Sequence, residues 1–421
     1  MADLSASSAT GGLLTTADGR PLKAALATAQ QRAKRKAFLL VLPLLLFIVL
    51  TFIIPIGQML QRSMYHDGFS ANAPALKAWF AENPQGTEPD EAAFAALASD
   101  LKLMKQEKTA GLAGTRINYS LGGTRSLFTG SARSADKLEP PYKEALLADD
   151  PKWGQPAVWQ AMRGASSAYT SEFYMIAMDM QRDDQGNLER VPENERIYAY
   201  LFVKTFALSG LITVICLALA FPVAHLLATL PMKWSNLLMI LVLLPFWTSL
   251  LVRTSSWIVL LQGQGVINNI LVSAGVVDDQ GRLEMIYNAT GTVIVMTHIL
   301  LPFMILPLYS VMRTIPPSYA RAARSLGATS WTTFRRIYLP QTLPGIGAGS
   351  LLVFILAVGY YITPALVGGA SGSLISNMID FHMDKANWSM AAALSAMLLA
   401  GVLVLYWLYD RLVGIDNLKL G

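Results

Sequence analysis

Residues 37–60 read AFLLVLPLLLFIVLTFIIPIGQML, a run that contains no charged side chain. A helix rises about 1.5 Å per residue, so this run is long enough to cross the roughly 30 Å hydrocarbon core of a bilayer. Five further apolar blocks of similar length follow at 205–228, 237–261, 291–311, 343–367 and 388–409. Because lipid offers the backbone no hydrogen-bond partners, each block is expected to be helical. The sequence therefore predicts an all-α, polytopic membrane protein with six transmembrane helices.

The composition agrees with this fold class. The chain has 421 residues, of which 53% are hydrophobic and only 14% are charged. An average soluble domain carries about 25% charged residues. The one cysteine, Cys216, lies inside an apolar block, so no disulfide framework is expected. These values argue against an ordinary soluble enzyme.

Lysine and arginine are unevenly distributed among the polar segments. Fourteen lie in the two terminal tails and in the 229–236 and 312–342 loops, against two in the 262–290 and 368–387 loops. Loops rich in these residues stay on the cytoplasmic side of the membrane. The distribution therefore predicts that both termini lie in the cytoplasm.

The long polar segment after the first span is expected to be a separate domain. In chain order, the sequence predicts a cytoplasmic tail 1–36, a first transmembrane helix 37–60, an extracytoplasmic insertion 61–204, a five-helix core 205–410 with a cytoplasmic loop 313–341, and a cytoplasmic tail 411–421. The insertion contains two sets of apolar residues at helical spacing: Phe94, Leu97, Leu101 and Met104, then Phe173, Ile176, Ala177 and Met180. This spacing predicts a mostly helical insertion.

Motifs that support catalysis are missing. The sequence has no G-x-x-x-x-G-K-[ST], no H-E-x-x-H and no C-x-x-C, so we expect no bound cofactor, no metal site and no enzymatic activity in this chain. None of the six apolar blocks contains Asp or Glu, which counts against a proton- or sodium-coupled secondary carrier. His298 lies within a span and is expected to hydrogen-bond a neighbouring helix, with a proton relay as the alternative. A secondary carrier and a non-transporting structural subunit remain alternative classes.

The most informative segment is the cytoplasmic stretch PSYARAARSLGATSWTTFRRIYLP at residues 317–340. It predicts two short helices about Gly327, a residue suited to the left-handed position after a helix end. Ser318 and Ser330 are candidate N-caps, and the second helix is expected to end before Pro340. Three apolar residues spaced three apart form a stripe on it: Trp331, Phe334 and Ile337. The pattern alone also fits an amphipathic hairpin on the lipid headgroups.

This stretch resembles the EAA loop of ABC-importer permeases, whose pattern is E-A-A-x-x-x-G followed by I-x-L-P. The matching positions are Arg321-Ala322-Ala323, Gly327 and Ile337-x-Leu339-Pro340. The segments LPFWTSLLVRT at 244–254 and LLPFMILPLY at 300–309 look like the spermidine/putrescine permease group. The resemblance covers about residues 200–410. It does not cover the long insertion, and Arg321 replaces the glutamate of the family pattern.

The resemblance implies a type I ABC importer that moves its solute by alternating access. Its expected partners are a second, paralogous permease subunit, two copies of an ABC ATPase that bind ATP and Mg, an extracytoplasmic solute-binding protein and the lipid bilayer, with no nucleic acid. It assigns the ATPase-coupling loop to Arg321, Ala322, Ala323, Leu326, Gly327, Trp331, Phe334, Ile337 and Pro340. The implied solute is a polyamine or a related organic cation, and an amino-acid-derived or opine-like solute is the alternative.

Two further groups of residues are candidates for contact with the solute. Arg253 is the one charged residue deep in a predicted span, about 24 Å along it, and charges at that depth usually face a cavity or the bundle interior. The alternative is that its side chain extends to the outer headgroups, about 12 Å away. The candidate translocation path contains Arg253, Trp247, Tyr360 and Tyr361. The candidate outer mouth, in a segment expected to be a loop, contains Asp380, His382 and Asp384.

Overall fold

The computed structural model describes residues 22–183 and 187–413, which form two units, 1–61 and 62–421. In the first unit, α1 (Leu22–Ile48) continues through a π turn, η1 (Val49–Ile53), into α2 (Ile54–Met64). The apolar side chains from Phe38 to Ile56 are largely exposed, as expected of a helix that faces lipid. The first predicted span is therefore confirmed as a helix. Residues 1–21 and 414–421, which include most of the predicted tails, lie outside the described residues.

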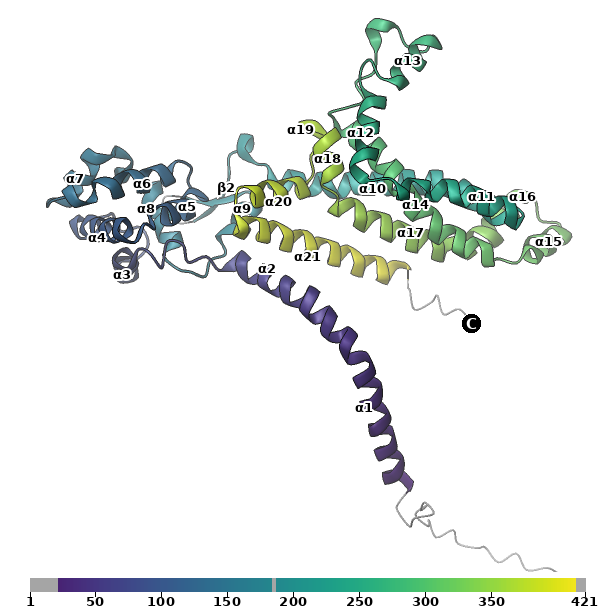
Figure 1. Cartoon of the computed structure of the whole chain (residues 1–421), viewed down its shortest axis with the longest axis horizontal. Helices are drawn as coiled ribbons and strands as arrows, with labels where there is room; N and C mark the ends of the chain where they lie inside the picture. Colours follow the sequence, from purple (N-terminus) through teal and green to yellow (C-terminus); the bar gives the residue numbers. More distant parts are fainter. Residues whose placement is uncertain (1–21, 184–186, 414–421) are drawn as a thin grey trace, which may run out of the picture. The chain divides into compact units, whose positions relative to one another are not determined.

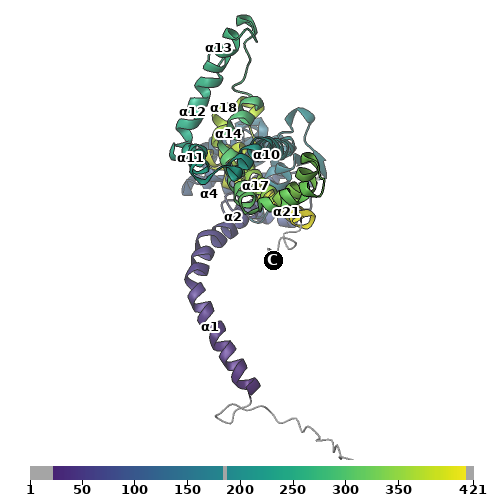
Figure 2. The same ribbon diagram turned by 90° about the vertical axis from the view of Figure 1, so that its right-hand side faces the viewer.

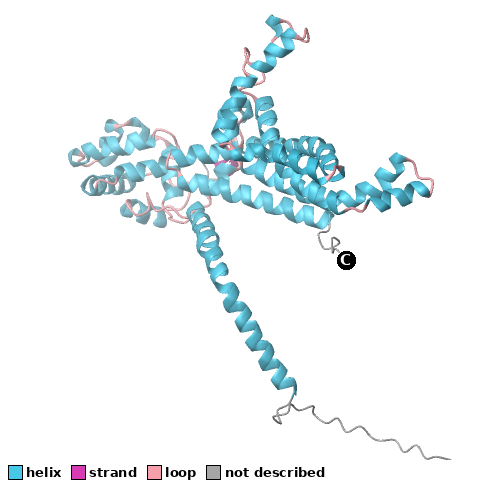
Figure 3. Cartoon of the chain, turned by 45° about the vertical axis from the view of Figure 1, so that its right-hand side comes forward, coloured by secondary structure: helices cyan, strands magenta, loops and turns pink. Residues whose placement is uncertain are grey.

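The insertion is a helical domain with a small hairpin (Figure 1). Its helices are α3 (Pro74–Glu82), α4 (Glu91–Glu107), α5 (Ala110–Asn118), α6 (Thr124–Ser134), α7 (Tyr142–Asp149), α8 (Pro156–Ala165) and α9 (Glu172–Ala177). The strands β1 (Met180–Arg182) and β2 (Leu188–Arg190) pair antiparallel, with Met180 opposite Arg190. Figure 3 shows that helix predominates among the residues that the structure describes.

The insertion has a hydrophobic core of its own. Phe94, Leu97, Leu101 and Met104 are all buried on α4, which confirms the first helical pattern. The second pattern is only partly confirmed, because α9 ends at Ala177 and Met180 begins β1. Asp179, with φ +55°, makes the turn between them.

Asp179 also joins the insertion to the membrane core. Its buried carboxylate accepts hydrogen bonds from the backbone N–H groups of Ile197, Tyr198 and Ala199 at 2.8–3.1 Å, where the first core helix begins. Phe173 and Ala177 of α9 pack in one cluster with side chains of that helix and of the C-terminal helices. The insertion is therefore tied to the ends of the core helices by both polar and apolar contacts.

Four long helices form the membrane core: α10 (Tyr198–Thr229), α14 (Ala289–Thr314), α17 (Leu339–Gly359) and α21 (Trp388–Val413). The first begins at Tyr198, seven residues before the predicted span. Helix α14 packs against both α10 and α17. A Cβ at Gly349 of α17 would lie 2.8 Å from Met304 Sδ of α14, so glycine permits this close contact.

The third predicted span, 237–261, is not one continuous helix. The segment forms α11 (Met232–Leu243), a 3-10 turn η5 (Leu244–Trp247), α12 (Leu250–Leu261) and α13 (Val266–Ser273). The two halves, Met232–Trp247 and Leu250–Ser273, meet at 97°. Pro245 and the extended residue Thr248 interrupt the helical hydrogen bonds here. The described residues hold five helices able to cross a membrane, or up to six if the bent pair is one span.

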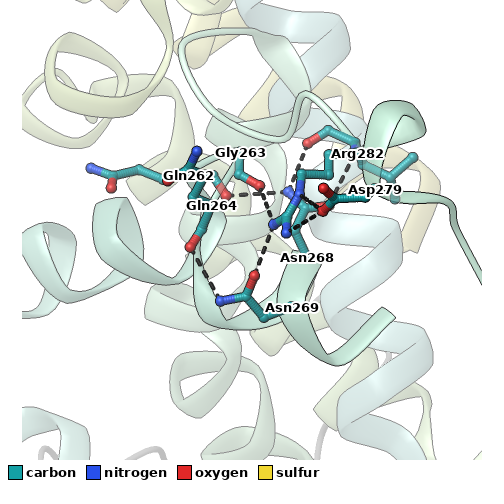
Figure 4. A network of polar contacts seen from close by, with 8 residues as sticks. Gln262, Gly263, Gln264, Asn268, Asn269, Asp279 and Arg282 are labelled. Carbon is teal, nitrogen blue, oxygen red and sulfur yellow. Dashed lines mark hydrogen bonds and ion pairs between the residues drawn. The ribbon is translucent and has the colours of Figure 1, made fainter. Parts of the chain in front are cut away.

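Helices α12 and α13 extend away from the long core helices (Figure 2). A polar network fixes the segment that follows them (Figure 4). The buried Asn268 amide donates to the carbonyls of Gln262 and Leu283, and the Arg282 guanidinium bonds Asn269 Oδ1 at 2.8 Å and Asp279 Oδ1 at 2.7 Å. The 262–290 segment, expected as a simple loop, is therefore a folded structure.

The fifth predicted span is also broken. Helix α17 ends at Gly359, and Tyr360 and Tyr361 separate it from α18 (Ile362–Val367). Two more helices, α19 (Gly369–Gly372) and α20 (Ile375–Asp384), follow where a loop was expected. The expectation of one continuous helix over 343–367 was therefore wrong.

Candidate coupling loop and translocation path

The candidate coupling loop consists of α15 (Pro317–Ser325), α16 (Ser330–Thr333) and a π turn, η7 (Phe334–Tyr338). Gly327 has φ +86°, which confirms its predicted left-handed position. Its N–H donates to Arg324 O at 2.9 Å, and Ala328 N–H donates to Ala323 O at 3.0 Å, so the pair closes the end of α15.

Both predicted N-caps of the loop were wrong. Helix α15 begins at Pro317, so Ser318 lies inside it, and proline suits the first position because its missing N–H would be unpaired there anyway. Thr329 caps α16 by accepting from Thr332 N–H at 3.2 Å, which places Ser330 inside that helix. The helix also does not end before Pro340, because η7 continues directly into α17.

The turn of the loop is strongly exposed. Leu326 is 88% and Trp331 68% exposed. The side chains of Arg321, Ala322 and Arg324 are exposed beside them. An apolar and basic surface of this kind is typical of a site that another protein covers.

Three aromatic side chains of the loop lie in a row. Trp331 stacks on Phe334 at 5.7 Å, and Phe334 stacks on Tyr338 at 6.2 Å. Residues three and four positions apart both share a helix face, so Tyr338 can lie beside Phe334 as well as the predicted Ile337.

The loop is attached to α10 at both of its ends. The Tyr338 hydroxyl lies 2.9 Å from His225 Nδ1 of α10, within hydrogen-bond distance. At the other end, the Arg313 guanidinium donates to Ala228 O at 2.8 Å and more weakly to Leu230 O at 3.4 Å. The sequence analysis missed all of these contacts. Arg313 contributed only to the charge count, and an isolated His in an apolar block carried no specific signal.

Arg253 lies at the break in the third span rather than deep in a straight helix. Its guanidinium turns back and donates to Thr248 O at 3.0 Å and to Pro245 O, which also accepts from the Thr248 N–H. Trp247, on the other side of the break, is 89% exposed. The structure therefore gives Arg253 a role at the break and leaves Trp247 uncovered by the described residues.

Tyr360 and Tyr361 lie at the break in the fifth span. Their carbonyls accept hydrogen bonds from Ser376 Oγ at 2.6 Å and from Asn377 Nδ2 at 2.9 Å, both in the first turn of α20. Nearby, Thr254 of α12 and Thr363 of α18 bring their hydroxyls within 3.5 Å, and both are fully buried. The two breaks are thus linked through α12 and α18.

His298 makes the interhelical hydrogen bond expected of it. Trp257 Nε1–H of α12 donates to His298 Nδ1 of α14 at 3.0 Å, and the two rings meet edge to face. This contact fixes α12 against α14.

The three candidate outer-mouth residues lie on α20, a helix rather than the expected loop. His382 Nε2 lies 2.9 Å from the Tyr198 hydroxyl of α10, and burial lowers the pKa of the imidazole. Asp384 is exposed and Asp380 is half-buried. Within residues 22–183 and 187–413, no three His, Cys, Asp or Glu side chains gather into a group that could hold a metal ion.

Comparison with known proteins places this geometry in context. Residues 215–414 match the family described as "Binding-protein-dependent transport system inner membrane component". The chain is 35% identical over 225 residues to the spermidine/putrescine transport system permease protein PotB of Haemophilus influenzae, covering 53% of this chain and 78% of that protein. It is 36% identical over 221 residues to PotB of Escherichia coli, covering 52% of this chain and 80% of that protein.

A solved structure is also similar. It is described as "Crystal structure of a bacterial ABC transporter involved in the import of the acidic polysaccharide alginate", with a TM-score of 0.48 and 17% identity over 70% of this chain and 99% of that chain. The insertion lies outside the family match, which begins at residue 215.

Proposed function

Because the chain belongs to the family of inner membrane components of binding-protein-dependent transport systems, we propose that it is the permease through which a polyamine or a related organic cation enters the cytoplasm. The observation that carries the choice of solute is the 35–36% identity to permeases named for spermidine and putrescine. The protein itself is a multi-pass inner membrane protein of an ABC importer.

In this proposal the exposed turn about Gly327 docks into an ATPase subunit, and two copies of that subunit bind ATP and Mg. The residues that make the contact are Arg321, Ala322, Ala323, Leu326, Gly327, Trp331, Phe334, Ile337 and Pro340. Their support is the exposure of Leu326 and Trp331 together with the closed helix end at Gly327. Covering an apolar side chain at such a turn stabilises the complex by about 25 cal/mol for each Å² of apolar surface buried.

ATP binding would then move the loops and convert the bundle from an inward-facing to an outward-facing form. A second permease subunit, paralogous to this chain, would supply the other half of the path. The solute would arrive from an extracytoplasmic binding protein and pass Arg253, Trp247, Tyr360 and Tyr361. Asp380, His382 and Asp384 would lie at the outer mouth, on the side where the insertion is also proposed to lie.

Uptake into proteoliposomes tests this proposal. The complex is reconstituted with ATP inside and its binding protein outside, and radiolabelled spermidine and putrescine are supplied. ATP-dependent accumulation of either supports the polyamine assignment. Accumulation of radiolabelled ornithine alone would favour the amino-acid-derived alternative, and no ATP-dependent uptake of any solute would overturn the importer.

The orientation has its own test. Both termini are proposed to be cytoplasmic, so green fluorescent protein fused after residue 421 should fluoresce and alkaline phosphatase fused there should be inactive. The opposite pair of results would refute the orientation.

A further inference from the structure

We propose that a ladder of four side chains, Trp331, Phe334, Tyr338 and His225, transmits movement of the coupling loop into helix α10. The proposal rests on the proposed function, in which an ATPase moves the loop. It goes further by assigning the connection between that loop and the membrane core to particular residues, which we regard as positioning residues.

The first argument is geometric. Three aromatic rings of the loop, those of Trp331, Phe334 and Tyr338, are stacked at 25–27° in a continuous row. The row ends on α10, where His225 meets the Tyr338 ring edge to face at 5.0 Å and also lies within hydrogen-bond distance of its hydroxyl. Phe221, one turn earlier on α10, meets Phe334 edge to face at 6.0 Å. Such ring pairs are attractive and directional, so they transmit displacement better than a single apolar contact.

The second argument is that the loop is held at both ends by the same part of α10. Arg313, just before α15, bonds Ala228 O and Leu230 O at the C-terminal end of that helix, where carbonyls lack helical partners. Tyr338, just after α16, bonds His225 in the preceding turn. The exposed segment between these two attachments contains Leu326 and Trp331. A force on that segment therefore acts on residues 221–230.

The third argument is the π turn itself. Leu339 N–H donates to Phe334 O, five residues back, in a turn that continues directly into α17. Single π turns inside helices are found mostly at functional sites. Here Phe334 begins the turn and Tyr338 ends it, so a change between π and α geometry would rotate one ring of the row relative to the other and relative to His225. The ladder thus has a local element able to engage and release it.

The experiment removes the hydrogen bond and keeps the rings. Tyr338→Phe, His225→Phe and the double variant are compared with wild type in the full complex in proteoliposomes. Tyr406→Phe is the matched control, because this tyrosine lies on α21, outside the coupling loop, and is 43% exposed. The measurements are retention of the ATPase on the tagged chain, ATP hydrolysis, and the amount of radiolabelled spermidine imported per ATP hydrolysed.

Each single variant is expected to retain the ATPase and to lower the spermidine-to-ATP ratio by about threefold to tenfold, the range of one hydrogen bond. The double variant should fall no further than the singles, because both changes remove the same bond. The control should match wild type. Two results would refute the ladder without touching the proposed function. One is an unchanged spermidine-to-ATP ratio in Tyr338→Phe, and the other is a free-energy loss in the double variant equal to the sum of the losses in the two single variants. If the wild-type chain retains no ATPase, the proposed function and the ladder are both wrong.

Discussion

The left-handed turn at Gly327 gives the sharpest test of the coupling assignment. Its φ of +86° is strained for any residue with a Cβ, and the cost for an L-residue is about 1–2 kcal/mol. A β-branched residue is expected at the upper end of that range, because such residues are true outliers there. A Cβ at this position would meet no atom within 4 Å, so Gly327→Val adds no clash. The whole effect of the substitution is therefore on the turn.

A penalty of this size reduces the population of the native turn by about fivefold to thirtyfold, since 1.4 kcal/mol is a factor of ten. Because the turn is exposed and makes none of the core contacts, the complex should still insert and keep its thermal midpoint. Spermidine uptake by the Gly327→Val complex should fall by about tenfold. Gly327→Asn should retain more uptake, since asparagine tolerates this conformation.

Gly86 supplies the matched control. It has φ +89°, and a Cβ there also meets nothing within 4 Å, but it lies in the insertion. Gly86→Val therefore imposes the same backbone strain far along the chain from the loop. The measurements are uptake, ATP hydrolysis and thermal midpoint for all variants. Normal uptake by Gly327→Val, or an equal loss in Gly86→Val, would refute the reasoning.

Three further predictions concern charge, capping and pH. Arg321→Glu should weaken retention of the ATPase by about tenfold at low salt. The loss should be smaller at high salt, because salt screens contacts between exposed charges. Unchanged retention would show that Arg321 does not pair with an acidic residue of the ATPase. Asp179→Asn should lower unfolding free energy by about 1–3 kcal/mol, seen as a lower thermal midpoint that the exposed Asp384→Asn does not share. Burial lowers the pKa of His382 in the folded protein. As the pH falls, the imidazole therefore takes up its proton more readily in the unfolded chain, and the free energy of unfolding should decrease below about pH 6.5. His382→Gln should flatten that dependence in a melting series, and an unaltered slope would show that another group titrates.

The positions of the membrane helices were predictable because apolar length depends on composition alone. Four of the six blocks lie within uninterrupted helical segments, the first of them with a π turn, and the α4 pattern in the insertion reappears as its buried face. The turn at Gly327 was predictable for a similar reason, since one residue type dominates that conformation. Local chemistry was sufficient in each of these cases.

Contacts between distant segments were not predictable from local chemistry. Asp179 and the start of α10 are about twenty residues apart along the chain, and His225 and Tyr338 are 113 apart. Nothing near His225 in the sequence indicates a tyrosine partner. Tyr338 was missed because the stripe was drawn from residues spaced three apart, and Tyr338 lies four residues after Phe334.

The two broken spans show why the candidate path residues cluster as they do. An apolar block has the same composition whether its helix is straight or broken, and a proline in it does not by itself mark a break, since Pro302 and Pro307 lie inside the continuous α14. At membrane depth, non-helical backbone is tolerated only where protein buries it or where it lines a water-filled cavity. Arg253 donates to backbone carbonyls at the first break, and Ser376 and Asn377 donate to backbone carbonyls at the second. Trp247, Tyr360 and Tyr361 lie at the edges of these breaks. Discontinuous helices of this kind form the solute sites of many transporters, so the breaks give a physical reason, independent of side-chain chemistry, to seek the path there.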